Sequence, residues 1–261
     1  MHPKIAALNE IPQNAQKSQA WLNQRKKYLT SSDAGTALGL NPYQKPEELL
    51  FSKCGMGKPF SGNEATRWGE KYEDEAIEMY CDSMGMVQHE FGLIPSEMVR
   101  RDPENDLFFP DSEFLAGSPD GIALPSESIE DGDAVLLEVK CPMRRKIKMG
   151  YCPKYYFPQV QLNMYICNVK HAAFIEYKPA IKLEQMTLNI VHYTRDDAWL
   201  AENIPKLKVF WDSVVYYREV GIDKHPDYLK YAWTEERSKA LLERETAAKV
   251  PQKCMLDSDE E

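Results

Sequence analysis

The chain has few features of a disulfide or metal-thiolate protein. Its six cysteines are scattered and form no C-x-x-C pair: Cys54, Cys81, Cys141, Cys152, Cys167 and Cys254. Isolated cysteines in an intracellular protein are ordinarily plain reduced thiols. The cysteine pattern therefore indicates neither a zinc site nor an iron–sulfur centre.

Long apolar runs are also lacking. No segment approaches the roughly 20 apolar residues of a membrane-spanning helix, and the start MHPKIAALNEIPQNAQ is not organised as a signal peptide. We therefore expect an intracellular protein, in the cytoplasm or nucleus of a host cell, that is neither secreted nor bound to a membrane.

Positive charge is in deficit. Lys and Arg number 32 against 41 Asp and Glu, which gives a net charge of −9. This balance argues against nucleic-acid binding by bulk attraction but leaves room for a local basic groove. The chain contains no internal repeat, and its one biased segment is the acidic end DSDEE.

The sequence does contain a helix–sheet–helix pattern, and 261 residues suffice for a single large domain. Helical periodicity and cap residues predict helices at 14–29, 46–53, 63–84, 154–168 and 196–220, and a charged helical stretch at 235–249. Strand-like runs occupy 86–94, 113–124, 134–142, 171–179 and 187–194, and the turn ESIEDGDA predicts an antiparallel hairpin. This order predicts an α/β (α+β) fold with a central mixed β-sheet flanked by helices, plus a helical C-terminal extension from about residue 223.

Charges interrupt the two apolar stretches of GSPDGIALPSESIEDGDAVLLEVKCP (117–142). On a strand, Glu138 and Lys140 face the same side and Val139 the other. Pairing as a hairpin would bring Asp120 beside Glu138. Two adjacent carboxylates stay ionised only when positive charge lies between them.

A divalent cation would supply that positive charge better than Lys140 alone. Oxygen ligands without histidine suit a hard ion, Mg²⁺ or Mn²⁺. The alternative is a surface salt bridge, because E-x-K occurs by chance in many proteins. The preceding SPDG favours the metal site.

Five ordered blocks extend this pattern from residue 25 to 165: RKKYLTSSD, WGEKYEDEA, SPDG, LLEVKCP and YFPQVQLNMY. Together they resemble the lambda-exonuclease-like (YqaJ-type) viral recombination nucleases of the PD-(D/E)xK superfamily. The resemblance implies a restriction-endonuclease-like core. It also implies that Asp120, Glu138 and the Val139 carbonyl hold one or two Mg²⁺ ions, that Lys140 orients the attacking water, and that Glu73 assists from a helix.

The resemblance further implies a pocket for a 5′-phosphate, formed by Arg25, Ser32, Ser118 and Gln159. A guanidinium with hydroxyl and amide donors suits an anion. The alternative for Arg25 is a helix-end salt bridge, and Ser32 could instead be an ordinary helix cap, as could its neighbour Ser31.

Other residues near these blocks have structural alternatives. Gln159 and Gln161 differ by about 200° around a helix axis, so only one can face the site, and we choose Gln159. For Tyr156 we favour packing, and for Glu70 a solvated surface position. Arg144 and Arg145, in the basic run RRKIK, either contact DNA phosphates or form a solvated face.

The resemblance thus implies a Mg²⁺-dependent, processive 5′→3′ exonuclease acting on double-stranded DNA ends. It would release 5′-mononucleotides and leave 3′ overhangs for recombination, beside a single-strand annealing protein. A trimeric ring would reconcile the acidic total charge with DNA binding. The alternatives are a structure-specific or nicking endonuclease on the same core, and a non-catalytic DNA-binding protein.

Overall fold

The computed structural model of the chain describes residues 2–57, 62–102, 104, 106–125, 134–181 and 185–232. The turn expected between residues 126 and 133, the helical stretch at 235–249 and the acidic end lie outside the described residues.

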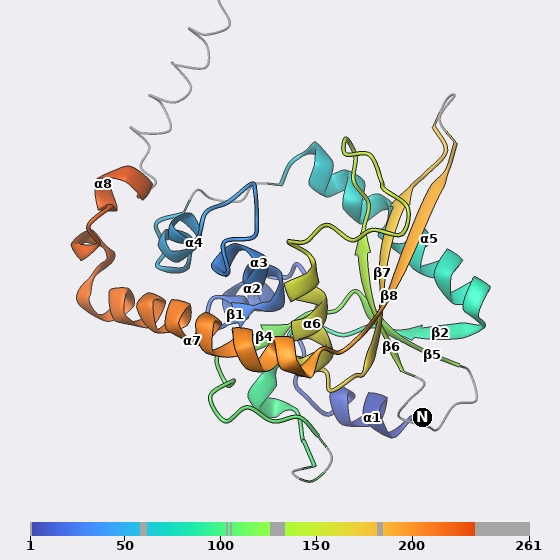
Figure 1. The fold of residues 1–261 in the computed structure, drawn as a ribbon, viewed down its shortest axis with the longest axis horizontal. Coiled ribbons are helices and arrows are strands. Elements are labelled where there is room, and N and C mark those ends of the chain that lie inside the picture. Colours follow the sequence, from blue (N-terminus) through green and yellow to red (C-terminus); the bar gives the residue numbers. More distant parts are fainter. Residues whose placement is uncertain are drawn as a thin grey trace, which may run out of the picture.

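A five-stranded mixed sheet forms the centre of the fold (Figure 1). In spatial order its strands are β2 (Met86–His89), β5 (Gly121–Pro125), β6 (Val135–Lys140), β7 (His171–Lys178) and β8 (Thr187–Thr194). Strands β6 and β7 are parallel, and the other neighbouring pairs are antiparallel. The predicted mixed sheet is confirmed, as is the antiparallel β5–β6 pairing, in which Gly121 lies opposite Leu137.

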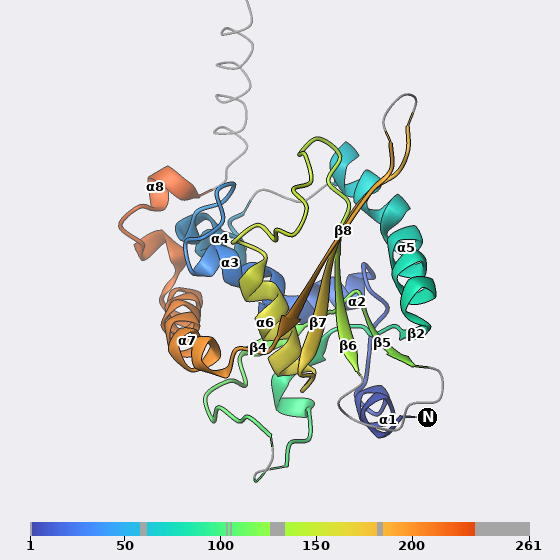
Figure 2. The ribbon, with the colours of Figure 1, turned by 45° about the vertical axis from the view of Figure 1, so that its right-hand side comes forward.

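Helix α5 (Glu64–Met84) covers one face of this sheet (Figure 2). Asn63 caps its first turn by accepting a hydrogen bond from the Thr66 backbone N–H at 2.8 Å, and Gly85 ends it with φ of 64°. The left-handed conformation of Gly85 is one that residues with a Cβ rarely adopt. The apolar side of α5 packs against alternate residues of β5, β6 and β7, including Val139. The predicted helix at 63–84 and the inward direction of Val139 are confirmed.

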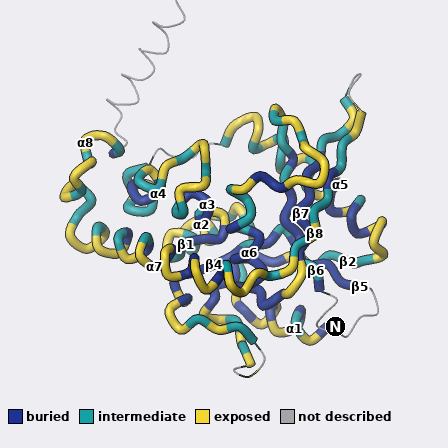
Figure 3. The backbone as a smooth tube through the Cα atoms, viewed as in Figure 1, coloured by how far each residue is buried: buried dark blue, intermediate teal, exposed yellow. Residues whose placement is uncertain are grey.

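Helices α6 (Phe157–Ile166) and α7 (Asp197–Val220) lie on the opposite side of the sheet from α5 (Figure 2). Phe174 of β7 packs toward α6, whereas its neighbours Ala173 and Ile175 pack toward α5. Asp196 caps α7 through a 2.8 Å bond from the Trp199 backbone N–H. Buried residues concentrate along α6 and strands β5 to β7 (Figure 3).

A second, three-stranded sheet lies beside the first. It has the order β1-β4-β3, with β1 (Leu29–Thr30), β4 (Leu115–Gly117) and β3 (Ile94–Pro95). Short helical elements of the N-terminal half accompany it: α1 (Pro3–Asn9), α2 (Gln19–Arg25), η1 (Ser31–Asp33), α3 (Ala34–Ala37), α4 (Pro46–Lys53) and η2 (Ser96–Met98). After α7, the chain forms η4 (Ile222–Lys224) and α8 (Tyr228–Tyr231), which packs against α4.

Two predicted strands are wrong as continuous elements. The run 86–94 divides into β2 and β3, and the run 113–124 divides into β4 and β5, one in each sheet. Within the second run the division falls at Ser118, Pro119 and Asp120. Proline has no N–H for a ladder hydrogen bond, so strand pairing stops there and the chain passes to the other sheet.

The predicted helix at 14–29 is also too long. Its observed part, α2, starts only at Gln19 because Ser18 caps it, accepting from the Trp21 backbone N–H at 3.2 Å. Lys17 has φ of 67°, outside the helical region. Periodicity alone could not locate this turn.

None of the described helices is both long and apolar enough to cross a lipid bilayer.

Candidate active site

Lys140 lies at the centre of a cluster formed where β5 and β6 meet. Its ammonium donates hydrogen bonds to Glu138 Oε1 and to the Val139 carbonyl, the latter at 3.0 Å, and lies 4.0 Å from Asp120 Oδ2. The Glu138 side chain is fully buried. The predicted neighbourhood of Asp120, Glu138 and Lys140 is therefore confirmed.

The break in the chain at Pro119 positions Asp120. Its backbone N–H still pairs with the Leu137 carbonyl at 3.2 Å, which fixes it at the edge of β6. Its carboxylate Oδ2 accepts the Val139 N–H at 2.6 Å. Gln16, from the segment before α2, donates to the Pro119 carbonyl at 3.3 Å and to the Phe91 carbonyl at 2.9 Å. The carboxylate is thus held in place by the backbone of β6.

The buried charges perturb one another strongly. Burial, with a smaller contribution from Asp120, raises the pKa of Glu138 to about 7, although Lys140 acts in the opposite direction. Burial alone would lower the pKa of Lys140, but the charges of Glu138 and Asp120 outweigh it and raise that pKa above its ordinary value. The ammonium therefore stays protonated and acts as the cation of the cluster.

The oxygens around the ammonium suit a divalent cation. Two carboxylates and one backbone carbonyl converge on a single positive centre, which is the donor set that a hard metal ion prefers. Among the described residues, no group of three or more His, Cys, Asp or Glu side chains could hold a metal. A metal here would thus rely on Asp120, Glu138 and the Val139 carbonyl.

Asn163 of α6 completes the surroundings of Glu138. Its side-chain amide donates to Glu138 Oε2 at 3.1 Å, so both oxygens of this carboxylate have partners. The Asn163 side chain is fully buried, and its Oδ1 has no hydrogen-bond partner among the described residues. Asn163 belongs to no expected site, and its contact with β6 spans 25 residues of sequence, so spacing could not reveal it.

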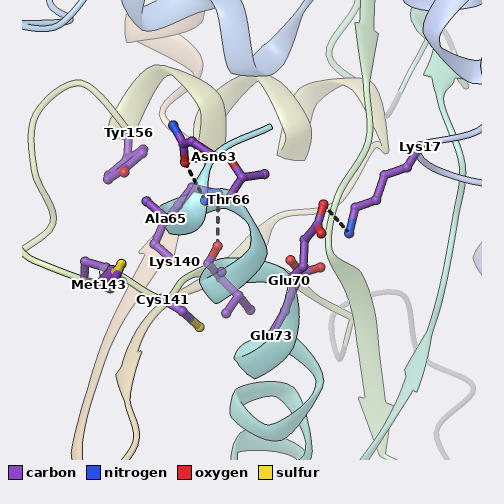
Figure 4. Close-up of a pocket in the computed structure, with 13 residues that line it drawn as sticks. Lys17, Asn63, Ala65, Thr66, Glu70, Glu73, Lys140, Cys141, Met143 and Tyr156 are labelled. Atoms are coloured by element: carbon purple, nitrogen blue, oxygen red, sulfur yellow. Dashed lines mark hydrogen bonds and ion pairs between the residues drawn. The ribbon is translucent and has the colours of Figure 1, made fainter. Parts of the chain in front are cut away.

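Glu73 of α5 faces the cluster across a cleft (Figure 4). A cavity of about 540 Å³ lies between Glu73, Lys140 and Tyr156, and a second of about 540 Å³ lies between Glu73 and Asp120. Burial, and after it the charge of Asp120, raises the pKa of Glu73 to about 7. Glu70, one turn away, is half exposed and pairs with Lys17 at 3.5 Å, as expected for a surface position.

Arg25, Ser32 and Ser118 come together beside α2. The Arg25 guanidinium donates to Ser32 Oγ at 2.8 Å and to Thr30 Oγ1 at 3.2 Å. Its carbon Cζ lies 4.4 Å from the ring centre of Trp21, whose indole N–H donates to Ser118 Oγ at 3.1 Å. Trp21 thus links Arg25 to Ser118, a contact across 97 residues that sequence spacing could not show.

The protein-family comparison matches residues 20–170 of the chain to the YqaJ-like viral recombinase domain. This range includes every residue of the predicted site. The chain belongs to the YqaJ-like viral recombinase family.

Two viral proteins resemble the chain in sequence. It is 31% identical over 186 residues to the uncharacterized protein R354 of Acanthamoeba polyphaga mimivirus, covering 67% of this chain and 31% of that protein. It is 27% identical over 190 residues to protein D345L of African swine fever virus (strain Badajoz 1971 Vero-adapted), covering 63% of this chain and 49% of that protein. The YqaJ-like chain therefore spans about a third to a half of the length of these relatives.

Solved structures share the fold of the YqaJ-like chain. The alkaline exonuclease LHK-Exo from Laribacter hongkongensis matches with a TM-score of 0.58 and 22% identity, covering 86% of this chain and 100% of that one. The structure of LHK-Exo in complex with dAMP matches with a TM-score of 0.60, the same identity and the same coverage. The predicted nuclease-type α/β fold is confirmed by this likeness.

The two glutamines of α6 in the YqaJ-like domain differ as expected. Gln161 is fully buried, where it accepts from the Asp196 backbone N–H at 2.7 Å and donates to the Thr194 carbonyl at 3.3 Å. It therefore joins α6 to the start of α7. Gln159 is only partly buried, in the first turn of α6, and this helix packs against η1, which carries Ser32.

Tyr156 has a packing role together with a contact to the cluster. Its ring lies 5.5 Å from the ring of Phe174 and 4.3 Å from that of Tyr155, and the Lys140 ammonium lies 5.5 Å from its centre. The ring thus forms one wall of the space around Lys140.

The two arginines of the basic run after β6 differ in burial. Arg145 donates to the fully buried carboxylate of Glu176, which also accepts from the Asn189 amide at 3.2 Å. Arg144 is largely exposed and lies 3.7 Å from Glu64 at the start of α5. Arg145 therefore anchors the segment, whereas Arg144 lies at the surface beside the cleft.

Proposed function

We propose that this chain is a Mg²⁺-dependent deoxyribonuclease that degrades double-stranded DNA from its ends in the 5′→3′ direction. Family membership and fold support the coarser part of the proposal, a nuclease associated with viral recombination. The observation that carries the finer part is the convergence of Asp120, Glu138 and the Val139 carbonyl on one cationic centre.

In this proposal Asp120, Glu138 and the Val139 carbonyl hold Mg²⁺, with Mn²⁺ as a substitute. The bound ion would supply an activated water and stabilise charge that develops on the phosphate. Lys140, which contacts all three ligand groups, orients the water and stabilises the same charge. Glu73, on the opposite side of the cleft, would help to position the water or Lys140. Attack of water on the phosphodiester releases a nucleoside 5′-monophosphate.

The direction of digestion is assigned from the Arg25 pocket. The Arg25 guanidinium contacts the Ser32 hydroxyl, Trp21 links it to the Ser118 hydroxyl, and Gln159 lies on the adjacent helix. This set of donors suits a terminal phosphate dianion. An endonuclease on the same core would need Asp120, Glu138 and Lys140 but no such pocket. Removal of 5′ nucleotides leaves a 3′ overhang, which can be used by a single-strand annealing partner.

The assembly and the surroundings of the protein remain part of this proposal. A homotrimeric ring would enclose DNA and allow processive digestion despite the net charge of −9. We place the protein inside the host cell. Arg144, exposed at the rim of the cleft, would contact DNA phosphates, and Arg145 would hold its segment in place.

The deciding experiment digests three DNA substrates in Mg²⁺ or in EDTA: a linear duplex with 5′-phosphate ends, the same duplex with 5′-hydroxyl ends, and a closed circle. We expect Mg²⁺-dependent release of mononucleotides, fastest from the 5′-phosphate ends, and no cleavage of the circle. Cleavage of the circle would favour the endonuclease. No cleavage of any substrate with Mg²⁺ or Mn²⁺ would favour a non-catalytic DNA-binding protein.

A further inference from the structure

A second charge lies close behind the Arg25 guanidinium. Thr30 connects the two: its Oγ1 accepts from Arg25 Nη2 at 3.2 Å and donates to Asp33 Oδ2 at 2.6 Å. The Thr30 backbone N–H donates to the same Asp33 oxygen at 3.1 Å. Because a hydroxyl has one proton, its commitment to Asp33 leaves the oxygen lone pairs free to accept from Arg25. Asp33 thereby fixes the acceptor that holds Arg25.

Lys53, from helix α4, neutralises Asp33. Its ammonium lies 2.6 Å from Asp33 Oδ2 and donates to the Tyr28 carbonyl at 3.0 Å. The side chains of Lys53 and Asp33 are 11% and 17% exposed, so solvent ions screen their interaction only weakly. The pair is a fixed, largely buried part of the wall behind the pocket.

The charge of Asp33 is persistent. Burial acts to raise the pKa of its carboxyl, but the charges of Lys53 and Arg25 and the hydrogen bonds from Lys53 and Thr30 outweigh burial and hold the pKa below its usual value. Asp33 is therefore ionised at neutral pH. An ionised carboxylate competes with any anionic ligand for the field of a nearby guanidinium. With Lys53 present, the Asp33 carboxylate interacts mainly with the Lys53 ammonium. Without Lys53, the negative charge of Asp33 would act mainly on the Arg25 guanidinium and weaken its attraction for a phosphate.

We propose that Lys53 is a positioning residue that determines specificity for 5′-phosphorylated ends, because it neutralises Asp33 and so leaves Arg25 free to bind the terminal phosphate. The proposal rests on the proposed role of Arg25. Lys53 acts through Asp33 and makes no contact with DNA in this role.

The test measures kcat/KM on linear duplexes with 5′-phosphate and with 5′-hydroxyl ends, and takes the ratio of the two. Lys53→Met should lower this ratio about tenfold, since a charge-assisted contact accounts for roughly ten- to a hundredfold. The double variant Asp33→Asn/Lys53→Met should restore the wild-type ratio, because it removes the competing carboxylate together with its partner. Lys26→Met is the matched control: it removes one positive charge next to Arg25 in the chain without affecting Asp33, and should leave the ratio unchanged.

A double variant whose ratio stays as low as that of Lys53→Met would overturn the proposal, because Lys53 would then act through its own charge on DNA. A wild-type ratio in Lys53→Met would overturn it as well. If Lys53→Met does not fold, the double variant is compared with Asp33→Asn: equal ratios support the proposal and a lower ratio in the double variant overturns it. Equal rates of the wild type on both ends would instead contradict the Arg25 pocket itself, and with it the proposed direction of digestion.

Discussion

Lys140 holds together groups that would otherwise repel one another. Its ammonium contacts Glu138 and the Val139 carbonyl and lies 4.0 Å from Asp120, so an internal cation already offsets part of the negative charge of the two carboxylates. A metal ion that uses the same oxygens must compete with Lys140 for them. The side chain of Lys140 is 23% exposed and borders a cavity, so it has space to move aside.

The first prediction concerns the individual carboxylates. Asp120→Asn should abolish nuclease activity while leaving the fold intact, because an asparagine oxygen can still accept the Val139 N–H but no longer carries the charge that a metal needs. Activity on linear duplex DNA and the circular dichroism spectrum measure the two parts. Glu70→Gln removes a carboxylate from the same cleft and should leave activity within about twofold, as expected for an exposed ion pair of little energetic weight. An active Asp120→Asn protein would refute the assignment of the site.

The second prediction concerns Asn163. Replacing Asn163 with alanine leaves Glu138 Oε2 without its donor, in a position that water does not reach. The free energy of unfolding should fall by about 1–3 kcal/mol, measured by urea denaturation. Nuclease activity should fall as well, since Glu138 is no longer held in one orientation. Unchanged activity would mean that Lys140 alone is sufficient to orient Glu138.

At the scale of elements, strand periodicity explains why the cluster of Asp120, Glu138 and Lys140 could be predicted and its surroundings could not. Alternation places Glu138 and Lys140 on one side of β6 whatever the tertiary structure, and the hairpin brings Asp120 to them. By contrast, Trp21, Lys53 and Asn163 reach the site through contacts between elements far apart in the chain. The local sequence around these three residues predicts only the apolar face of a helix or the end of one. The division of β4 from β5 depended on which sheet each half joins, which a run of apolar residues does not indicate.

The third prediction concerns the packing of α6 against β4. A Cβ at Gly117 would lie 2.4 Å from Asn163 Oδ1, closer than any normal contact. Gly117→Ala should therefore destabilise the protein by about 1–3 kcal/mol. In the double variant Gly117→Ala/Asn163→Ala the obstacle is gone, so the combined loss should be smaller than the sum of the single losses.

Urea denaturation of the four proteins gives the coupling energy directly. Gly69→Ala serves as the control, because a Cβ at this helical position meets nothing within 4 Å and alanine favours helices. It should be neutral or slightly stabilising. Additive losses in the double variant would show that Gly117 is constrained by something other than Asn163.

At the scale of the whole molecule, two features matter for ligand binding: the acidic total charge and the part of its relatives that the chain matches. The YqaJ-like domain takes up residues 20–170, and the viral relatives extend beyond the part that matches this chain. With a net charge of −9, the proposed affinity for DNA would have to come from local features such as the Arg25 pocket and the cleft between α5 and β6. The proposed metal ligands, by contrast, all belong to the protein, so metal binding should be measurable without DNA.

The fourth prediction is that Mg²⁺ or Mn²⁺ stabilises the free protein. A ligand that binds only the folded state at about 100 times its Kd adds about 2.7 kcal/mol to the free energy of unfolding. Thermal unfolding should shift upward with metal concentration in the wild type and should not shift in Glu138→Gln, whose side chain keeps the shape but loses the charge. An equal shift in both proteins would place the metal elsewhere.

The short segment Ser118–Pro119–Asp120 joins the small sheet to the large one, and it carries a residue of the proposed end pocket and a residue of the proposed metal site. Two residues of chain span at most roughly 7 Å, comparable to the spacing of successive phosphates along one DNA strand. In the proposed function, this segment would therefore set the distance between the phosphate-binding residue and the metal-binding residue. Because this distance is set by the backbone, it would be the same on every DNA sequence. Each released fragment would then be one nucleotide long.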